Sequence, residues 1–314
     1  MNLRRRTLNL ALAFSAILPA TGVWAATGSS TANHALHSND THSSASRVEG
    51  TRTQVISTPQ GSKVEVFVNG QGTPIVLLPS RGRGAEDFDP VVPYLVKRNY
   101  QVIRPEPRGI GKSQGAMKDI TLKDLAGDID EVLKQVAGGK PVVIVGHAFG
   151  NWVARMTAVE HPEHVRGVVI IAAAAKKYPG AMPELVEKVR HATDMTVPEA
   201  DRLAALKYGF FVREKDARAW LGGGYAEVSK SQRAAGNATP QAQWWSGGDT
   251  PLLEIQGELD PFKPKETRGE MKEEFGDRIT TVVIPDASHA LVPEQPEKLA
   301  EALDGWIGTL PAVK

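Results

Sequence analysis

Short apolar runs recur along this chain from about residue 50 onward, and most of them alternate with stretches whose apolar residues are spaced as in a helix. The runs are bounded by turn residues, and the clearest cover residues 74–79, 141–145, 165–173 and 251–256. A continuous apolar run of this length is typical of a strand that is buried on both faces. Strands alternating with helices predict an α/β fold, with a mostly parallel sheet of the eight-stranded type and helices on both faces.

The alternation stops near Lys176 and resumes near Pro251. Residues 176–248 have helical and loop patterns only, so we expect them to form a helical lid inserted after the sixth strand. The predicted core therefore consists of residues 48–175 and 249–314. Thr121 precedes an amphipathic stretch of the core and is expected to cap its helix.

The first 25 residues have the three parts of a secretory signal peptide, namely a basic start with three arginines, a short apolar run and a small residue at Ala25. The arginines partly resemble a twin-arginine signal, and a retained membrane anchor is the alternative. Residues 26–47 are polar, which predicts a flexible linker. We therefore expect a periplasmic or secreted protein with no stable membrane span after the leader is removed.

The chain has 37 Lys and Arg residues, 36 Asp and Glu residues, and no Cys. Without residues 1–25 the net charge changes from +1 to −2, because that segment carries three Arg and no acidic residue. This balance argues against electrostatic binding of nucleic acid, so we expect a small-molecule substrate or ligand as the partner. The absence of Cys excludes disulfides and thiolate metal sites. No dinucleotide or phosphate-loop motif is present, so neither a cofactor nor a metal is expected.

Three short motifs lie where predicted parallel strands end, which is where sheets of this kind place their ligands. The first is Gly-His-Ala-Phe-Gly at 146–150, which runs directly from a predicted strand into a predicted helix. The second is Gly-Glu-Leu-Asp at 257–260, and the third is Asp-Ala-Ser-His at 286–289. Two earlier loops, at 80–84 and 104–113, also follow predicted strands.

In this order, the motifs resemble the α/β-hydrolase fold superfamily, of the esterase, lactonase and haloperoxidase-like type, over about residues 50–312. Residues 146–150 are similar to its nucleophile elbow G-x-S-x-G, and residues 104–113 to its D-x-R-G-x-G-x-S loop. Residues 80–84 stand in the place of its H-G loop. The resemblance implies a nucleophile, acid and base in that chain order.

The same resemblance assigns roles to individual positions. Asp260 is implied as the acid, with Glu258 as the alternative, and His289 as the base. The oxyanion hole is implied to use the backbone N–H of Phe149 and that of either Arg81 or Ser80.

The chain departs from the family pattern at Ala148, which stands at the nucleophile position. A methyl group cannot attack a carbonyl carbon, and the Ser80 hydroxyl is a remote substitute. Three interpretations stay open: an engineered Ser-to-Ala inactive esterase, a natural enzyme that uses the His289–Asp260 pair alone, and a non-catalytic ligand-binding homologue.

We expect an exported hydrolase in which His289 activates water for attack on an ester, lactone or related carbonyl substrate with an apolar portion. The alternative is a non-hydrolytic base catalyst, either a lyase or a cofactor-free oxygenase.

Five further side chains are candidates for substrate binding. A guanidinium beside the oxyanion loop can hold an anionic group, and indoles in the lid can form an apolar roof. The competing interpretation is that these side chains face solvent or only pack the lid and the elbow. The candidates are Arg83, His147, Trp220, Trp244 and Trp245.

Overall fold

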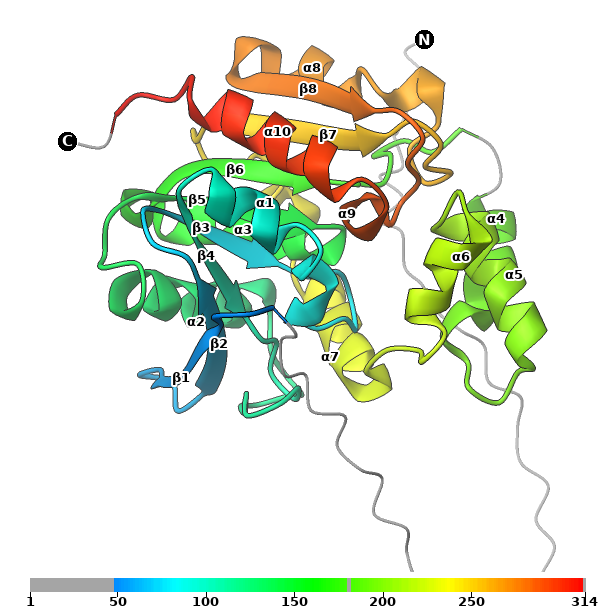
Figure 1. Ribbon diagram of the computed structural model, residues 1–314, viewed down its shortest axis with the longest axis horizontal. Helices are drawn as coiled ribbons and strands as arrows, with labels where there is room; N and C mark the ends of the chain where they lie inside the picture. Colours follow the sequence, from blue (N-terminus) through cyan, green and yellow to red (C-terminus); the bar gives the residue numbers. More distant parts are fainter. Residues whose placement is uncertain (1–47, 180–181, 313–314) are drawn as a thin grey trace, which may run out of the picture. The chain divides into compact units, whose positions relative to one another are not determined.

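The computed structural model describes residues 48–179 and 182–312 (Figure 1). The predicted leader (1–25) and linker (26–47) lie outside the described residues. Within the described ranges, no helix combines the length and the apolar composition needed to cross a membrane.

An eight-stranded mixed sheet forms the centre of the described part of the chain, in the order β1-β2-β4-β3-β5-β6-β7-β8. β2 pairs antiparallel with β1 and with β4, and the other pairings are parallel. This architecture confirms the predicted α/β fold with a mostly parallel eight-stranded sheet. The strands are β1 (Arg52–Ser57), β2 (Lys63–Asn69), β3 (Thr73–Leu78), β4 (Tyr100–Pro105), β5 (Val142–His147), β6 (Val165–Ile171), β7 (Leu252–Gly257) and β8 (Ile279–Ile284).

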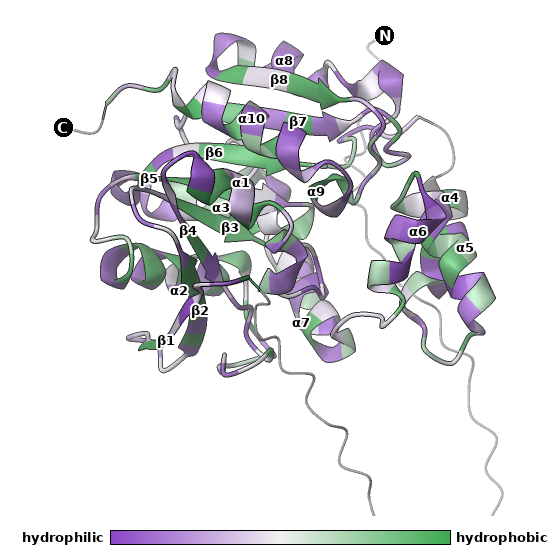
Figure 2. Ribbon diagram, viewed as in Figure 1, coloured by the Kyte–Doolittle hydropathy of each residue, from purple (hydrophilic) through white to green (hydrophobic). Residues whose placement is uncertain are grey.

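Helices cover both faces of the sheet and divide its core into two apolar clusters. Along β3, Ile75 and Leu77 belong to one cluster and Val76 and Leu78 to the other, as the alternation of side chains in a strand requires. Figure 2 shows the central strands as largely apolar, which agrees with burial on both faces. The first cluster includes α1 (Val92–Lys97), α9 (Leu291–Glu294) and α10 (Pro296–Ile307), and the second includes α2 (Leu122–Gln135), α3 (Phe149–Glu160) and α8 (Glu270–Phe275).

Local signals explain how two of these helices begin. The Thr121 hydroxyl accepts a hydrogen bond from the N–H of Lys123, and the Asp124 carboxylate accepts one from the N–H of Thr121, so the predicted cap of α2 is confirmed. A short 3₁₀ turn, Lys265–Thr267, precedes α8 and is separate from it. Gly269 precedes α8 and separates the two pieces.

The insertion between β6 and β7 contains only helices and turns where the structure describes it. Residues of α5, α6 and the turn after α6 form a separate small apolar cluster. α7 packs instead against α2, and the N–H of Leu122 donates to the Thr239 hydroxyl just beyond α7 at 2.9 Å. The helices are α4 (Met182–Val189), α5 (Glu199–Gly209), α6 (Glu214–Ala217) and α7 (Ala226–Ala238).

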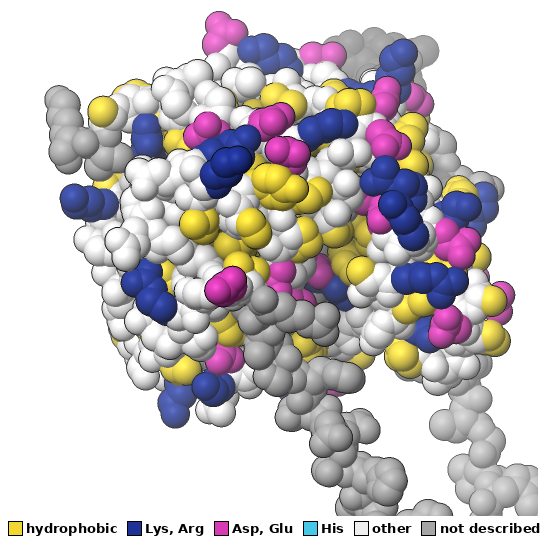
Figure 3. All heavy atoms as spheres, in the orientation of Figure 1, with side chains coloured by type: hydrophobic (Ala, Val, Ile, Leu, Met, Phe, Trp, Pro, Cys, Tyr) yellow, Lys and Arg dark blue, Asp and Glu magenta, His cyan; other side chains and the backbone are white. Residues whose placement is uncertain are grey.

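Charged side chains of both signs share the surface. On the face drawn in Figure 3, basic and acidic groups are interspersed and do not separate by sign. Several form exposed ion pairs, such as Arg213 with Asp286 at 3.0 Å. That face therefore has no extended basic stripe of the kind that nucleic-acid binding uses.

Candidate active site

The turn between β5 and α3 has the strained geometry of an elbow. Ala148 has φ 46° and ψ −109°, a conformation that L-residues rarely adopt. Its N–H donates to the carbonyl of Ile171 on the neighbouring strand at 2.9 Å. Gly150 allows the first turn of α3 to approach the end of β3, because a Cβ there would lie 2.3 Å from the carbonyl oxygen of Leu78. Position 148 is therefore held by backbone contacts on both sides.

The base and the acid meet beside this elbow. Nδ1 of His289 lies 2.9 Å from Oδ2 of Asp260, and the N–H of Phe262 donates to Oδ1 of the same carboxylate at 2.8 Å. Asp260 is 3% exposed and His289 is 8% exposed, so their hydrogen bond is shielded from water. The carboxylate fixes the proton on Nδ1 and leaves Nε2 as the acceptor. Glu258, the alternative acid, is exposed and accepts instead from the N–H of Asp286.

His147 joins the base to the elbow. It is fully buried, and its Nε2 lies 2.8 Å from the backbone carbonyl of His289, to which Nε2–H donates. Burial lowers the pKa of His147 to about 4, and the nearby His289 ring adds to the shift. His147 is thus a neutral donor that holds the base loop against the residue preceding Ala148. The structure brings Asp260, His289 and the elbow together, while their catalytic roles stay predictions.

Two aromatic rings that the sequence did not single out for the base surround His289. Phe262 lies 4.6 Å from the imidazole, centroid to centroid, and Phe210 lies 5.7 Å away in an edge-on arrangement. Phe262 follows Asp260 by two residues, and this closeness to the acid in the sequence could have predicted its place beside His289. Phe210 comes from the end of α5, some eighty residues away, and no local pattern indicates its position.

A fully buried lysine anchors the acid loop from behind. Nζ of Lys263 lies 3.2 Å from a carboxylate oxygen of Glu254 on β7 and 2.6 Å from one of Glu270 on α8. Burial raises the pKa of Glu254, and the ammonium of Lys263 opposes the shift. The N–H of Lys263 also donates to the carbonyl of Asp260 at 3.2 Å. The sequence analysis missed this residue.

The proposed oxyanion donors come from two adjoining segments. Phe149 is the first residue of α3, where the N–H has no acceptor within the helix. The loop 80–84 follows β3 after Pro79. A Cβ at Gly150 would lie only 2.3 Å from the carbonyl oxygen of Leu78, the last residue of β3. Ser80 is half-buried and Arg81 has an exposed side chain. In the described part of the chain, no hydrogen bond links the Ser80 hydroxyl to His289, so its predicted remote role as a nucleophile gains no support.

Arg83 and Trp220 are engaged with the protein itself. The Arg83 guanidinium forms a bidentate ion pair with Asp87, which lies at 2.5 and 2.9 Å, and it stacks 4.4 Å above the Trp220 ring. Although burial opposes its charge, the ion pair raises the pKa of Arg83. All three guanidinium nitrogens of Arg83 already donate within the protein, so the prediction that Arg83 clamps a substrate anion gains no support.

Trp244 and Trp245 are also engaged with the protein itself. Both are buried in the core cluster under α3, 3% and 7% exposed, with the Arg155 guanidinium 4.5 Å from each ring. Trp244 stacks on Trp152 at 4.9 Å. The indoles enclose a fully buried arginine, so the prediction that they line a substrate pocket gains no support. The fifth candidate, His147, is also a packing residue, since it is completely covered.

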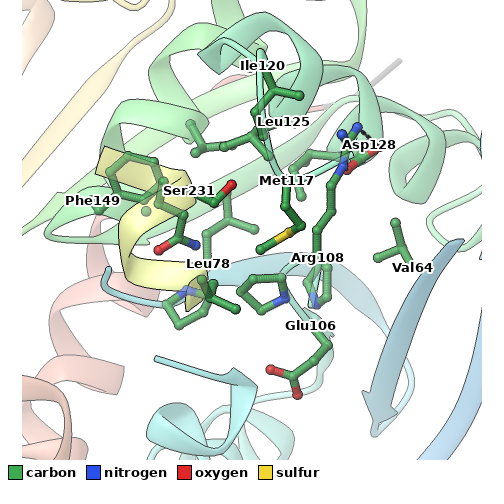
Figure 4. A pocket seen from close by; sticks show the side chains of 18 residues that line it. Val64, Leu78, Glu106, Arg108, Met117, Ile120, Leu125, Asp128, Phe149 and Ser231 are labelled. Atoms are coloured by element: carbon green, nitrogen blue, oxygen red, sulfur yellow. Dashed lines mark hydrogen bonds and ion pairs between the residues drawn. The ribbon is translucent and has the colours of Figure 1, made fainter. Parts of the chain in front are cut away.

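A mostly apolar cavity of about 60 Å³ lies beneath α7, next to Phe149 and Pro79 (Figure 4). Figure 4 shows Phe149 and Ser231 on one side and the Arg108–Asp128 ion pair on the other. The cavity lies against Phe149 and against Pro79, which immediately precedes the loop 80–84. Its remaining lining includes Met117, Ile120, Leu125 and Val228.

Comparisons with known proteins agree with this fold. A family model described as alpha/beta hydrolase fold matches residues 73–296. The chain is 25% identical over 264 residues to an (E)-2-((N-methylformamido)methylene)succinate hydrolase of Acinetobacter baylyi, which covers 78% of this chain and 94% of the relative. It is 25% identical over 246 residues to a pyrethroid hydrolase of Sphingobium wenxiniae, covering 74% and 86%. An esterase structure from Exiguobacterium antarcticum matches with TM-score 0.68 at 19% identity, over 82% of this chain and 100% of that one.

Proposed function

The chain belongs to the α/β hydrolase fold family, and from that premise we propose that it is an exported hydrolase of an ester, lactone or related carbonyl compound with an apolar portion. Relatives of low identity are ester or amide hydrolases, which supports this reaction class. The leader predicted over residues 1–25 supports export. The observation that carries the proposal is the shielded 2.9 Å hydrogen bond between His289 and Asp260 beside the elbow.

In the proposed reaction, His289 acts as a general base toward water. Nε2 takes a proton from a water molecule while the water oxygen attacks the substrate carbonyl carbon, in the space that a serine hydroxyl at position 148 would fill. Asp260 stabilises the imidazolium that forms. The imidazolium then returns its proton to the leaving alkoxide as the carbon–oxygen bond breaks. A positioned base of this kind contributes about 100- to 10,000-fold in rate.

The developing negative charge on the carbonyl oxygen requires donors that are already in place. We assign this role to the N–H of Phe149 and to an N–H of Ser80 or Arg81. Each preorganised donor contributes about 3 kcal/mol to transition-state stabilisation. Because the donors are backbone groups, they do not depend on whether position 148 carries Ala or Ser.

Replacing the base tests the proposal directly. His289→Ala is expected to lower the turnover of short p-nitrophenyl esters and lactones about 100- to 10,000-fold. Turnover in ¹⁸O-labelled water is expected to place one solvent oxygen in the acid product. Unchanged turnover in His289→Ala contradicts the proposal, and a product without solvent oxygen favours the lyase or oxygenase alternative.

A second variant tests whether the reaction avoids a covalent step. The unchanged protein is expected to resist labelling by a fluorophosphonate, since Ala148 offers no nucleophile. Ala148→Ser is the matched control and is expected to be labelled at that position, because His289 and the oxyanion hole are in place. Labelling of the unchanged protein at Ser80 would overturn the water mechanism.

A further inference from the structure

The loop 80–84, which supplies one proposed oxyanion donor, is held by the lid. The N–H of Gly82 donates to Oε1 of Gln232 on α7 at 2.7 Å. The carbonyl of Gly82 accepts from the N–H of Tyr225, just before α7, at 2.9 Å. Both polar groups of one residue are therefore bonded to a segment about 150 residues away in sequence.

The next residue of the loop is held in the same way. Nη1 of Arg83 donates to the carbonyl of Gly223 at 2.6 Å, and its guanidinium stacks on Trp220. Within the loop, the N–H of Arg83 donates to the carbonyl of Ser80 at 3.2 Å. Lid contacts on Gly82 and Arg83 thus fix a turn whose first residues are Ser80 and Arg81.

The approach of the loop to α7 is close enough to exclude a side chain. Gly82 has φ 65°, and a Cβ there would lie 2.7 Å from the Cβ of Ser229 on α7. Gly82 is buried and Gln232 is 7% exposed, so the hydrogen bond between them is shielded from bulk solvent. Gln232 also lines the cavity beside Phe149.

We propose that Gln232 is a positioning residue for the oxyanion hole: by accepting the Gly82 N–H, it sets the conformation of the loop that provides the second donor. This inference rests on the proposed function. It also gives a support to a loop, residues 80–84, that lacks the His-Gly pair of the H-G loop in whose place it stands. Oxyanion stabilisation depends on donor geometry, and a displacement of about 1 Å costs roughly 100-fold in rate.

The test compares two replacements of similar size. Gln232→Met removes the acceptor and is expected to lower kcat about tenfold to a hundredfold with KM changed less than about twofold. Gln232→Glu keeps an acceptor oxygen at the same reach and is expected to restore most of kcat. Lys230→Met, on the exposed side of α7, controls for the new methionine and is expected to have no effect. Equal kcat in Gln232→Met and the unchanged protein overturns the proposal.

A readout without turnover separates this proposal from the proposed function. In Gln232→Met, hydrogen exchange of a peptide covering residues 80–84 is expected to accelerate at least about tenfold, with no change in Gln232→Glu. Unchanged exchange shows that Gln232 does not hold the loop and overturns the proposal.

If the unchanged protein hydrolyses none of these substrates, the effect of Gln232 on the oxyanion hole is measured in the Ala148→Ser variant. There, adding Gln232→Met is expected to slow fluorophosphonate labelling about tenfold, because the phosphoryl oxygen occupies the same hole. Undiminished labelling overturns the positioning role even when the proposed hydrolysis has already failed.

Discussion

The two loops on either side of Ala148 are anchored to different parts of the molecule. The loop that carries Asp260 is tied through Lys263 to Glu254 and Glu270, which lie on β7 and α8 of the core. The loop 80–84 is tied through hydrogen bonds and a stacked guanidinium to the segment 220–232 of the lid. The acid loop is therefore positioned by charges buried within the core, and the oxyanion loop by an insertion packed onto it.

The acid loop therefore depends on the stability of the core, and the oxyanion loop depends on the packing of the insertion. Elements with few buried contacts open at lower free energy than the core, and we expect the insertion between β6 and β7 to behave in this way. The lid does touch the base, since Phe210 lies against His289 and its carbonyl accepts the Ala290 N–H at 2.8 Å. The polar anchors of the acid loop nevertheless come from core strands and helices. Variants on the two sides should therefore differ in which part of the fold they loosen.

Breaking the core anchor is expected to give the largest loss of stability. Lys263→Met leaves Glu254, which is fully buried, without its cation and is expected to lower the free energy of unfolding by about 3–5 kcal/mol. Because the pKa of Glu254 is raised in the folded state, the folded protein binds more protons, and stability should fall further as pH rises above about 4.3. Denaturant unfolding across pH measures both effects.

The matched control is Lys272→Met. Lys272 is about half exposed and pairs with the fully exposed Asp277 at 3.1 Å, so its loss is expected to cost less than about 0.5 kcal/mol. Equal small losses for the two lysine variants would mean that the buried cluster does not anchor the acid loop.

An intermediate loss of stability is expected at Gly150, next to the oxyanion loop, where close backbone packing and not a buried ion pair holds the structure. Gly150→Ala brings a Cβ to 2.3 Å from the carbonyl oxygen of Leu78 and is expected to cost about 1–3 kcal/mol as β3 and α3 separate. Gly127→Ala in α2 is the control, since its nearest neighbour lies at 3.9 Å. That control is expected to gain about 0.5–1 kcal/mol from helix propensity. Melting curves that shift in the same direction for both variants would contradict the close contact.

The fold, and the placing of Asp260 and His289 near the elbow, were predictable from the sequence because both follow from local patterns. Strand ends in a parallel sheet share one edge, so the motifs ending at Asp260 and His289 had to lie near the elbow. The anchors were not predictable in the same way. The Gly82–Gln232 bond joins segments 150 residues apart, and nothing in the composition of α7 indicates which of its polar residues faces inward.

The tryptophans of residues 176–248 show the same limit of prediction from the sequence. Composition identified a concentration of indoles but not the face that each would present. Trp220 packs under Arg83, whereas Trp244 and Trp245 enclose Arg155 in the core. Both arrangements depend on an arginine from a distant segment, which periodicity within the lid does not reveal.

The smallest effect on stability is expected at His147, which links the loop of His289 to the elbow. Its pKa of about 4 lies below the ordinary value of 6.5, so the folded protein binds fewer protons, and stability falls as pH drops from about 6.5 toward 4. His147→Gln keeps an N–H donor for the His289 carbonyl but does not titrate. It is expected to remove this acid sensitivity, worth about 1 kcal/mol at pH 6 relative to pH 8. Urea unfolding at both pH values measures the difference, and an acid dependence that survives the substitution would show that another group causes it.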